Sequence, residues 1–296
     1  MVGLAGGRKG AGAALALAGA LACAHAPAAP PAETPNPGAA GATESIRVEY
    51  RAPKNPRDRD LEESLRQRRF LELFAEVLAA IRLPRPLTLV LQDCDGESNA
   101  WYSPAQGAVI FCYEYVADLG RMASRATEKG IRPDDAWDGA MAFVLLHETS
   151  HALFDLLAVP VLGKEEDAAD QLAGWTLLRT GREAARRLLA GAAWMYLSEA
   201  RGRAADESDF ADVHGLHAQR YYNVLCLAYG SDAGFFGGLV RQGYLPAERA
   251  EGCEEEWQQV DYAAKTLVQG HVDAQAAARI RERYQKRWGE SVKGAR

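Results

Sequence analysis

Two histidines and a glutamate interrupt the apolar stretch FVLLHETSHALFDLL, Phe143 to Leu157. On a helix, His147 and His151 are four residues apart, so their rings project from the same face one turn apart. This spacing brings two imidazole nitrogens within reach of one tetrahedral zinc ion. Glu148 follows the first histidine and could take a proton from a water that the metal has acidified, as general base. The pattern H-E-x-x-H is a metalloprotease signature.

The flanks of this motif favour a metal site over a polar cluster in the core. The segments MAFVLL and ALFDLLAV are apolar nearly all round, which is typical of a buried central helix. Polar groups buried there need partners, because an unsatisfied one costs on the order of a few kcal/mol. A hydrogen-bonded cluster without metal is the alternative. The paired histidines with an intervening glutamate favour zinc, one ion per chain.

A third protein ligand is expected soon after the motif. The turn in AVPVLGK leads into a second helix, EEDAADQLAGWTLL, that could run back against the first. Glu166 and Asp170 share one face of it, and we expect Glu166 to bind the metal and Asp170 to accept a hydrogen bond from a ligand histidine. Asp170 could be the ligand instead, and Glu165 and Asp167 remain alternatives.

A zinc peptidase also needs a donor for the oxyanion of its tetrahedral intermediate. The segment DFADVHGLHAQRYYNVLC is the richest source downstream. His214 is the first candidate, as a second catalytic residue, followed by Arg220 and Tyr221. We assign no role to His217 or His271.

The rest of the chain must position these residues. We expect a strand in SIRVEYRA and an amphipathic helix over Asp60–Leu83. A hairpin-like unit should follow, made of Leu87–Asp93 and Gly107–Tyr115, and AVIFCYEY is the candidate strand for pairing with an extended peptide. Six helices are expected beyond it: Ala136–Leu157, Lys164–Arg179, Arg182–Ala200, Asp209–Ala228, Ala247–Gln269 and Val272–Trp288. This order predicts an α+β fold, with a small N-terminal β-sheet or hairpin unit packed on a mostly helical domain.

The N-terminus has the pattern of a signal peptide. Arg8 and Lys9 precede an apolar run too short to span a membrane, and Ala24-His25-Ala26 fits a cleavage site. The predicted organisation is a signal peptide over 1–26, a Pro/Ala-rich linker over 27–44 and one domain over 45–290. Export to the periplasm or the medium follows, and lipoprotein anchoring through Cys23 is the second choice.

Four cysteines remain after the signal peptide, and an even set in an exported chain indicates two disulfides. Spacing favours Cys94–Cys112 and Cys226–Cys253, because each pair flanks a short local unit. The formal net charge is −6, and acidic residues accompany the arginines. Nucleic acid is therefore not an expected partner. No later segment is apolar enough to be a transmembrane helix.

The chain resembles a family of bacterial zinc metallopeptidases. The resemblance lies in NAWYSP, VIFCYEY, HETSHALFDLLAVPVLGKEEDAADQLA, FADVHGLHAQRYYNVLCLAYGSD and YLPAERAEGCEEEW, from about Leu87 to Gln269. It implies a zincin-like domain with a gluzincin-like site, in which His147, Glu148 and His151 have their usual roles. It also implies that the four cysteines belong to the scaffold. The segment DVHG departs from the pattern, with Val213 where a glutamate is expected.

These observations predict an exported zinc-dependent peptidase acting on a peptide or protein. Two alternatives remain: a zinc-dependent amidase acting on cell-wall material, and a non-catalytic, disulfide-stapled protein whose metal site has four protein ligands.

Overall fold

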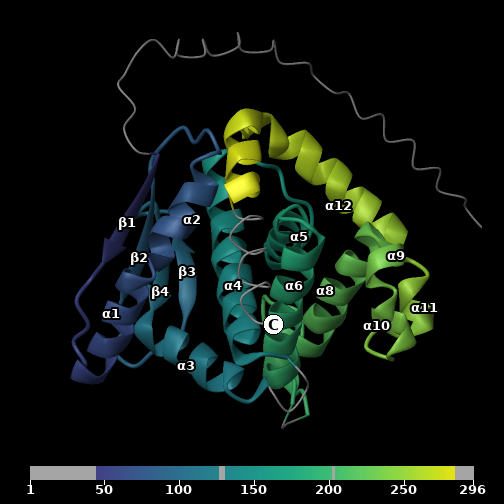
Figure 1. Ribbon diagram of the computed structural model, residues 1–296, viewed down its shortest axis with the longest axis horizontal. Helices are drawn as coiled ribbons and strands as arrows, with labels where there is room; N and C mark the ends of the chain where they lie inside the picture. Colours follow the sequence, from purple (N-terminus) through teal and green to yellow (C-terminus); the bar gives the residue numbers. More distant parts are fainter. Residues whose placement is uncertain (1–44, 127–130, 202–203, 284–296) are drawn as a thin grey trace, which may run out of the picture. The chain divides into compact units, whose positions relative to one another are not determined.

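The computed structural model describes residues 45–126, 131–201 and 204–283. The chain divides into two units, Met1–Gly41 and Ala42–Arg296, and every described residue lies in the second. The predicted signal peptide (1–26) and linker (27–44) therefore lie outside the described residues. Figure 1 shows a sheet beside a larger group of helices, which is the α+β fold that the sequence predicts.

The sheet has four strands in the order β1-β2-β4-β3. They span Ile46–Tyr50 (β1), Leu87–Gln92 (β2), Ala100–Ser103 (β3) and Ala108–Cys112 (β4). Strands β1, β2 and β4 are parallel, and β3 pairs antiparallel with β4. Alternation places Leu89 and Val109 in the main core and Val90 and Ile110 on the opposite face.

Two expectations about this sheet are wrong. Strands β2 and β4 do not form a hairpin, because their connection holds β3, which makes the hairpin with β4 instead. The candidate peptide-pairing strand AVIFCYEY is not at an edge either. Its first part is β4, between β2 and β3, and Tyr113 already begins a helix. The edge beside the helices belongs to β3.

The helices largely follow the predicted pattern. Those before the histidine motif are η1 (Pro56–Asp58), α1 (Arg59–Gln67), α2 (Phe70–Leu78) and α3 (Tyr113–Ala123). The next are α4 (Pro133–Leu156), α5 (Glu165–Leu178), α6 (Arg182–Glu199), α7 (Glu207–Ala211) and α8 (His217–Ser231). The last are α9 (Ala233–Phe236), α10 (Gly238–Arg241), α11 (Ala247–Ala250), α12 (Cys253–Leu267) and η3 (Gln269–His271), and residues 274–283 are helical.

Three predicted helices are interrupted. The helix expected over Asp60–Leu83 divides into α1 and α2, because Arg69 adopts a left-handed φ of 52° that an α-helix cannot contain. The segment Asp209–Ala228 divides at 212–216, where an extended backbone separates α7 from α8. Ala247–Gln269 likewise divides into α11 and α12.

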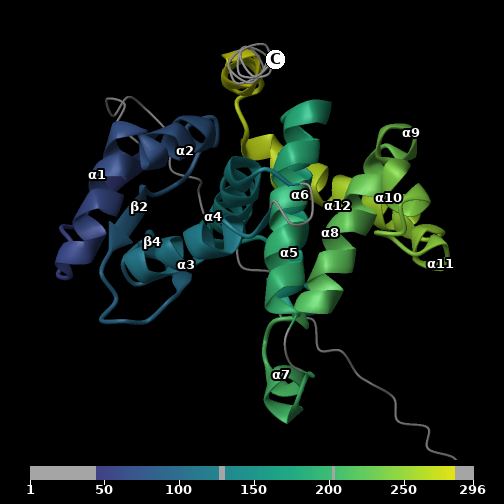
Figure 2. The same ribbon diagram turned by 60° about the horizontal axis from the view of Figure 1, so that its bottom comes forward.

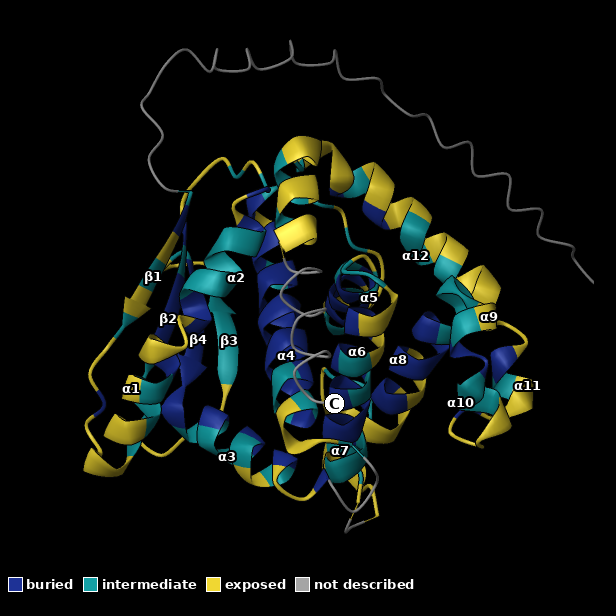
Figure 3. Cartoon of the chain, viewed as in Figure 1, coloured by how far each residue is buried: buried dark blue, intermediate teal, exposed yellow. Residues whose placement is uncertain are grey.

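Helix α4 is the centre of the molecule. Pro133 at its start and acidic residues in its first turn suit a helix N-terminus. Most of its length is buried, as the dark blue ribbon in Figure 3 shows. It crosses α6 so closely that a Cβ on Gly139 would lie 2.2 Å from the Leu188 carbonyl oxygen. Only glycine permits this approach, and α4 is thereby held against α6.

Helices α5, α6 and α8 lie beside one another next to α4 (Figure 2). Helix α12 covers α5 and α8 and exposes its outer face (Figure 3). Among the described residues no helix combines the length and apolar character that crossing a membrane requires.

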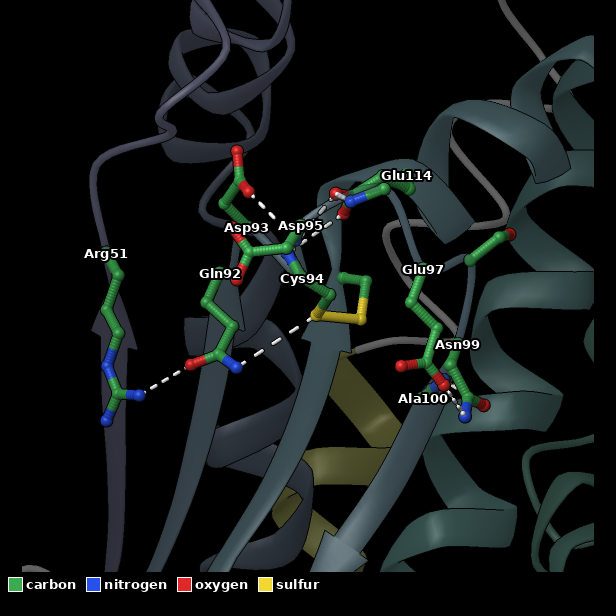
Figure 4. The surroundings of a disulfide bond; sticks show 12 residues. Arg51, Gln92, Asp93, Cys94, Asp95, Glu97, Asn99, Ala100 and Glu114 are labelled. Carbon is green, nitrogen blue, oxygen red and sulfur yellow. Dashed lines mark hydrogen bonds between the residues drawn. A yellow bond between two sulfur atoms is a disulfide. The ribbon is translucent and has the colours of Figure 1, made fainter.

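Both predicted disulfides are present, Cys94–Cys112 and Cys226–Cys253. The first ties the end of β2 to the end of β4 (Figure 4). The carboxylate of Glu114 adds to this anchor, because its Oε1 accepts hydrogen bonds from the backbone N–H groups of Cys94 and Gly96 at 3.2 and 2.8 Å. The second disulfide joins α8 to α12.

Candidate metal centre

Three side chains from α4 and α5 bring their ligand atoms together. His147 Nε2 and His151 Nε2 are 3.2 Å apart, and Glu166 Oε2 lies 3.0 Å from the first and 3.3 Å from the second. A zinc ion with four ligands at about 2.0–2.1 Å in a tetrahedron separates neighbouring ligand atoms by about 3.3 Å. The three atoms already have nearly this spacing. The donor set, two imidazoles and a carboxylate, is also one that zinc prefers.

The second ring nitrogen of each histidine is held by a carboxylate. His147 Nδ1 lies 2.8 Å from Asp170 Oδ1, and His151 Nδ1 lies 2.7 Å from Glu165 Oε1. Each Nδ1–H can donate to its carboxylate, which directs the Nε2 lone pair toward the cluster. The structure thus places Glu166, rather than Asp170 or Glu165, next to both Nε2 atoms, as the candidate third ligand. Asp167, the other alternative, lies outside this group of ligand atoms.

Glu148 is buried beside the cluster without joining it. Its Oε1 is 4.0 Å from His147 Nε2, and its Oε2 accepts a hydrogen bond from the backbone N–H of Tyr102 at 3.1 Å. Burial raises the pKa of Glu148, and the nearby histidines oppose that rise. A carboxylate with a raised pKa can hold a proton transiently, as a general base must.

His214, in the segment between α7 and α8, also lies beside the cluster. Its Nε2 lies 2.9 Å from Glu166 Oε2, and its Nδ1 lies 2.9 Å from Asp212 Oδ1. His214 is half-buried. It does not belong to the three residues whose ligand atoms all lie within 4.8 Å of one another. The cluster therefore has three mutually close ligands with His214 at its side.

Hydrogen bonding in the cluster favours positive charge on its imidazoles. Burial disfavours the imidazolium of His147, but hydrogen bonds to Asp170 and Glu166 outweigh it and raise its pKa to about 9. For Glu166, burial is outweighed by the bonds from His147, His151 and His214, and its pKa lies well below the usual range. A site that attracts positive charge so strongly suits a divalent cation.

The remaining candidates lie elsewhere or have another role. Arg220 is not directed at the cluster's ligand atoms but forms an ion pair with Asp170. Tyr221 is buried against Tyr222. His217 Nδ1 lies 3.1 Å from Glu199 Oε2, and its ring stacks on Tyr196 outside the cluster. His271 is in η3.

Sequence reasoning missed several contacts. Asp212 precedes His214 by two residues, a spacing that could have drawn attention to it. No sequence pattern indicates the backbone N–H of Tyr102 or the hydroxyl of Tyr196 as part of the site, because both reach it only through long-range packing.

A cavity of about 490 Å³ is lined by residues of α5, α8 and the segments beside them, and none of the cluster's ligand residues lines it. Its lining includes Asp167 and Gly215, which directly follow Glu166 and His214 in the chain. The side chains around it are mainly polar: Lys164, Asp167, Gln219, Tyr222, Asn223 and Arg249.

On its other side, the cluster is bordered by β3, the edge of the sheet. The Tyr102 N–H points away from β4, its only strand partner in the described sheet, toward Glu148. The outward N–H groups of Ala100 and Tyr102 donate to Asn99 and Glu148, so this sheet edge is bonded to the candidate catalytic carboxylate.

Fold and site together define a metallopeptidase-like protein, with an HExxH helix, a glutamate from the next helix and a sheet edge alongside. The chain belongs to the family DUF4344, described as "Putative metallopeptidase", whose model matches residues 50–268. Neither the curated proteins nor the solved structures that were compared with the chain gave a match.

Proposed function

We propose that this protein is an exported zinc-dependent peptidase that hydrolyses peptide bonds. The observation that carries the proposal is the triangle of His147 Nε2, His151 Nε2 and Glu166 Oε2, whose sides of 3.0–3.3 Å match the edges of a zinc tetrahedron. Membership of a metallopeptidase family supports it. The two disulfides support export, because such bonds persist in oxidising compartments.

In this proposal His147, His151 and Glu166 hold the zinc ion. When bound, zinc would acidify a water molecule and polarise the substrate carbonyl. Glu148 takes the proton from the attacking water at Oε1, the oxygen that the Tyr102 N–H does not occupy. It then passes this proton to the nitrogen of the leaving amine.

His214 is the proposed oxyanion donor. Its Nε2 faces the cluster, and the contact with Asp212 at Nδ1 holds the ring in place. A donor in this position stabilises the negative charge that develops on the carbonyl oxygen. The hydrogen bond that the His214 Nε2–H donates to Glu166 must be replaced by one to substrate during turnover.

Strand β3 favours a peptide over other amides. An extended substrate would pair with the outward carbonyl groups of β3, because the outward N–H groups of Ala100 and Tyr102 already donate to Asn99 and Glu148, and it would cross the cluster between Glu148 and His214. A side chain beyond the scissile bond could then enter the polar cavity near Gly215.

The test combines zinc content with turnover. Elemental analysis of protein purified from an oxidising compartment should find one zinc per chain in the wild type and in Glu148→Gln, and none in Glu166→Ala. Asp167→Ala is the matched control, because it removes the neighbouring carboxylate outside the cluster and should keep the metal.

A peptide-library screen with the wild type should show cleavage that Glu148→Gln loses by at least about 10³-fold. A wild type that stays free of zinc after supplementation would overturn the metal site. Full zinc occupancy with no cleavage of any peptide would favour a non-catalytic metal site.

A further inference from the structure

A buried guanidinium holds the carboxylate that orients His147. Arg220, on α8, is only 9% exposed, and it donates two parallel hydrogen bonds to Asp170. Nε donates to Oδ2 and Nη2 donates to Oδ1, each at 2.7 Å. The guanidinium also lies 4.5 Å above the ring of Tyr196. Such a fork fixes both the place and the plane of a carboxylate.

Asp170 Oδ1 lies within hydrogen-bond distance of three donor groups. Besides Arg220, it contacts His147 Nδ1 at 2.8 Å and the Tyr196 hydroxyl at 3.1 Å. Asp170 itself is only 9% exposed. An isolated carboxylate at such a depth would cost several kcal/mol, so it needs the charge of Arg220. Arg220 therefore fixes the orientation of the Asp170 carboxylate, and with it the direction of the hydrogen bond between Oδ1 and His147 Nδ1.

The same arginine supports the segment that carries His214. The stem of Arg220 lies against Gly215, since a Cβ built there would be 3.7 Å from Arg220 Cγ. Gly215 directly follows His214. One side chain thus bonds the carboxylate behind a proposed zinc ligand and has its stem near the residue that follows the proposed oxyanion donor.

We propose that Arg220 is a positioning residue of the zinc centre, because its ion pair with Asp170 orients His147. The inference rests on the proposed function, because it assumes that His147 binds zinc. It gives Arg220 a role different from that of an oxyanion donor, since two of its nitrogens are committed to Asp170.

A merely structural role is the competing explanation, because any buried ion pair between helices supports folding. The chain contains a control ion pair of similar burial, in which the carboxylate also bonds a second arginine, Arg132. Arg187, on α6, forms an ion pair with Asp135, on α4, and their side chains are 11% and 12% exposed, against 11% and 11% for Arg220 and Asp170. Asp135 has no contact with the histidine cluster among the bonds found for the described residues.

The experiment compares Arg220→Met with Arg187→Met. We would measure zinc affinity by competition with a chromophoric chelator, the absorption spectrum of the Co²⁺-substituted protein, and the midpoint of thermal unfolding. Both variants should unfold at lower temperature. Only Arg220→Met should lose about 10- to 100-fold in zinc affinity and shift the Co²⁺ bands.

Arg220→Lys and Tyr196→Phe keep the inference testable if Arg220→Met does not fold. Lysine retains the charge without the fork, so Arg220→Lys should recover only part of the affinity. Tyr196→Phe removes one donor from Oδ1 and should lower the affinity less than Arg220→Lys does.

Wild-type affinity and an unchanged Co²⁺ spectrum in Arg220→Met, or in Arg220→Lys if only that variant folds, would overturn the inference and leave the proposed function intact. An equal loss of affinity in Arg187→Met would also overturn it, by showing a general effect of destabilisation. A wild type that binds neither metal would instead reject the proposed function, and the inference with it.

Discussion

The backbone N–H of Tyr102 donates a hydrogen bond to Glu148 Oε2 at 3.1 Å, which links the edge strand β3 to the HExxH helix α4. This bond occupies one oxygen of Glu148 and leaves the other free beside His147 Nε2. It also defines where β3 lies relative to the cluster. This hydrogen bond therefore couples the position of the proposed general base to that of strand β3.

Tyr102→Pro removes the donating N–H, whereas Tyr102→Ala removes only the side chain. Proline is tolerated at an edge strand where its N–H faces away from the sheet. We expect Tyr102→Pro to lower the turnover of a cleaved peptide about tenfold relative to Tyr102→Ala, which corresponds to about 1.4 kcal/mol for a hydrogen bond to a charged group. Zinc content should be equal in both. Equal turnover would show that the bond does not position Glu148.

His214→Ala should lower kcat by about 10²- to 10³-fold, because it removes the proposed oxyanion donor. Zinc content should not change, since His214 is not one of the three mutually close ligand residues. His217→Ala is the control, as this histidine contacts Glu199 outside the cluster. Loss of zinc from His214→Ala would instead identify His214 as a fourth ligand.

One partly buried carboxyl group, that of Asp138, should contribute less to stability as pH rises. Burial, together with the charges of Asp134 and Asp135, raises the pKa of Asp138 from 3.8 to about 6. The native state therefore binds this proton more tightly than the unfolded chain does, and the contribution of Asp138 to stability declines as pH rises from about 4 to about 6. Above pH 6 the ionised group costs about 1–3 kcal/mol, and below pH 4 it costs nothing.

Asp138→Asn should accordingly be more stable than the wild type at pH 7.5 and equally stable at pH 3.5. Urea unfolding at the two pH values measures the difference. A gain that persists unchanged at pH 3.5 would show that it does not arise from ionisation of Asp138.

The two disulfides should stabilise the fold by similar amounts. The separations of 18 and 27 residues predict about 3 kcal/mol each, with a difference of only about 0.4 kcal/mol. Replacing Cys94 and Cys112 by alanine should also reduce turnover, because that bond anchors the connection carrying β3 (Figure 4). The Cys226/Cys253 double variant is the comparison. Denaturant unfolding and peptide cleavage, both under non-reducing conditions, distinguish the two effects.

The main helices could be predicted because their signals are local. The apolar flanks of α4 and the turns that bound α5 and α6 place these elements to within about three residues. The sheet order could not be predicted in the same way. Whether β2 and β4 pair as a hairpin depends on what lies between them, and the short strand β3 has no strong pattern of its own.

By itself, the sequence determined that His147 and His151 face the same way with Glu148 beside them, because helix geometry places i and i+4 on one face whatever surrounds it. Spacing also sufficed for both disulfide pairs. Only the tertiary structure placed Glu166 Oε2 beside the two Nε2 atoms and Asp170 behind His147, and brought His214 and the Tyr102 N–H to the same cluster. These choices depend on how α4, α5, α8 and β3 pack, and that packing is set by burial summed over the whole core.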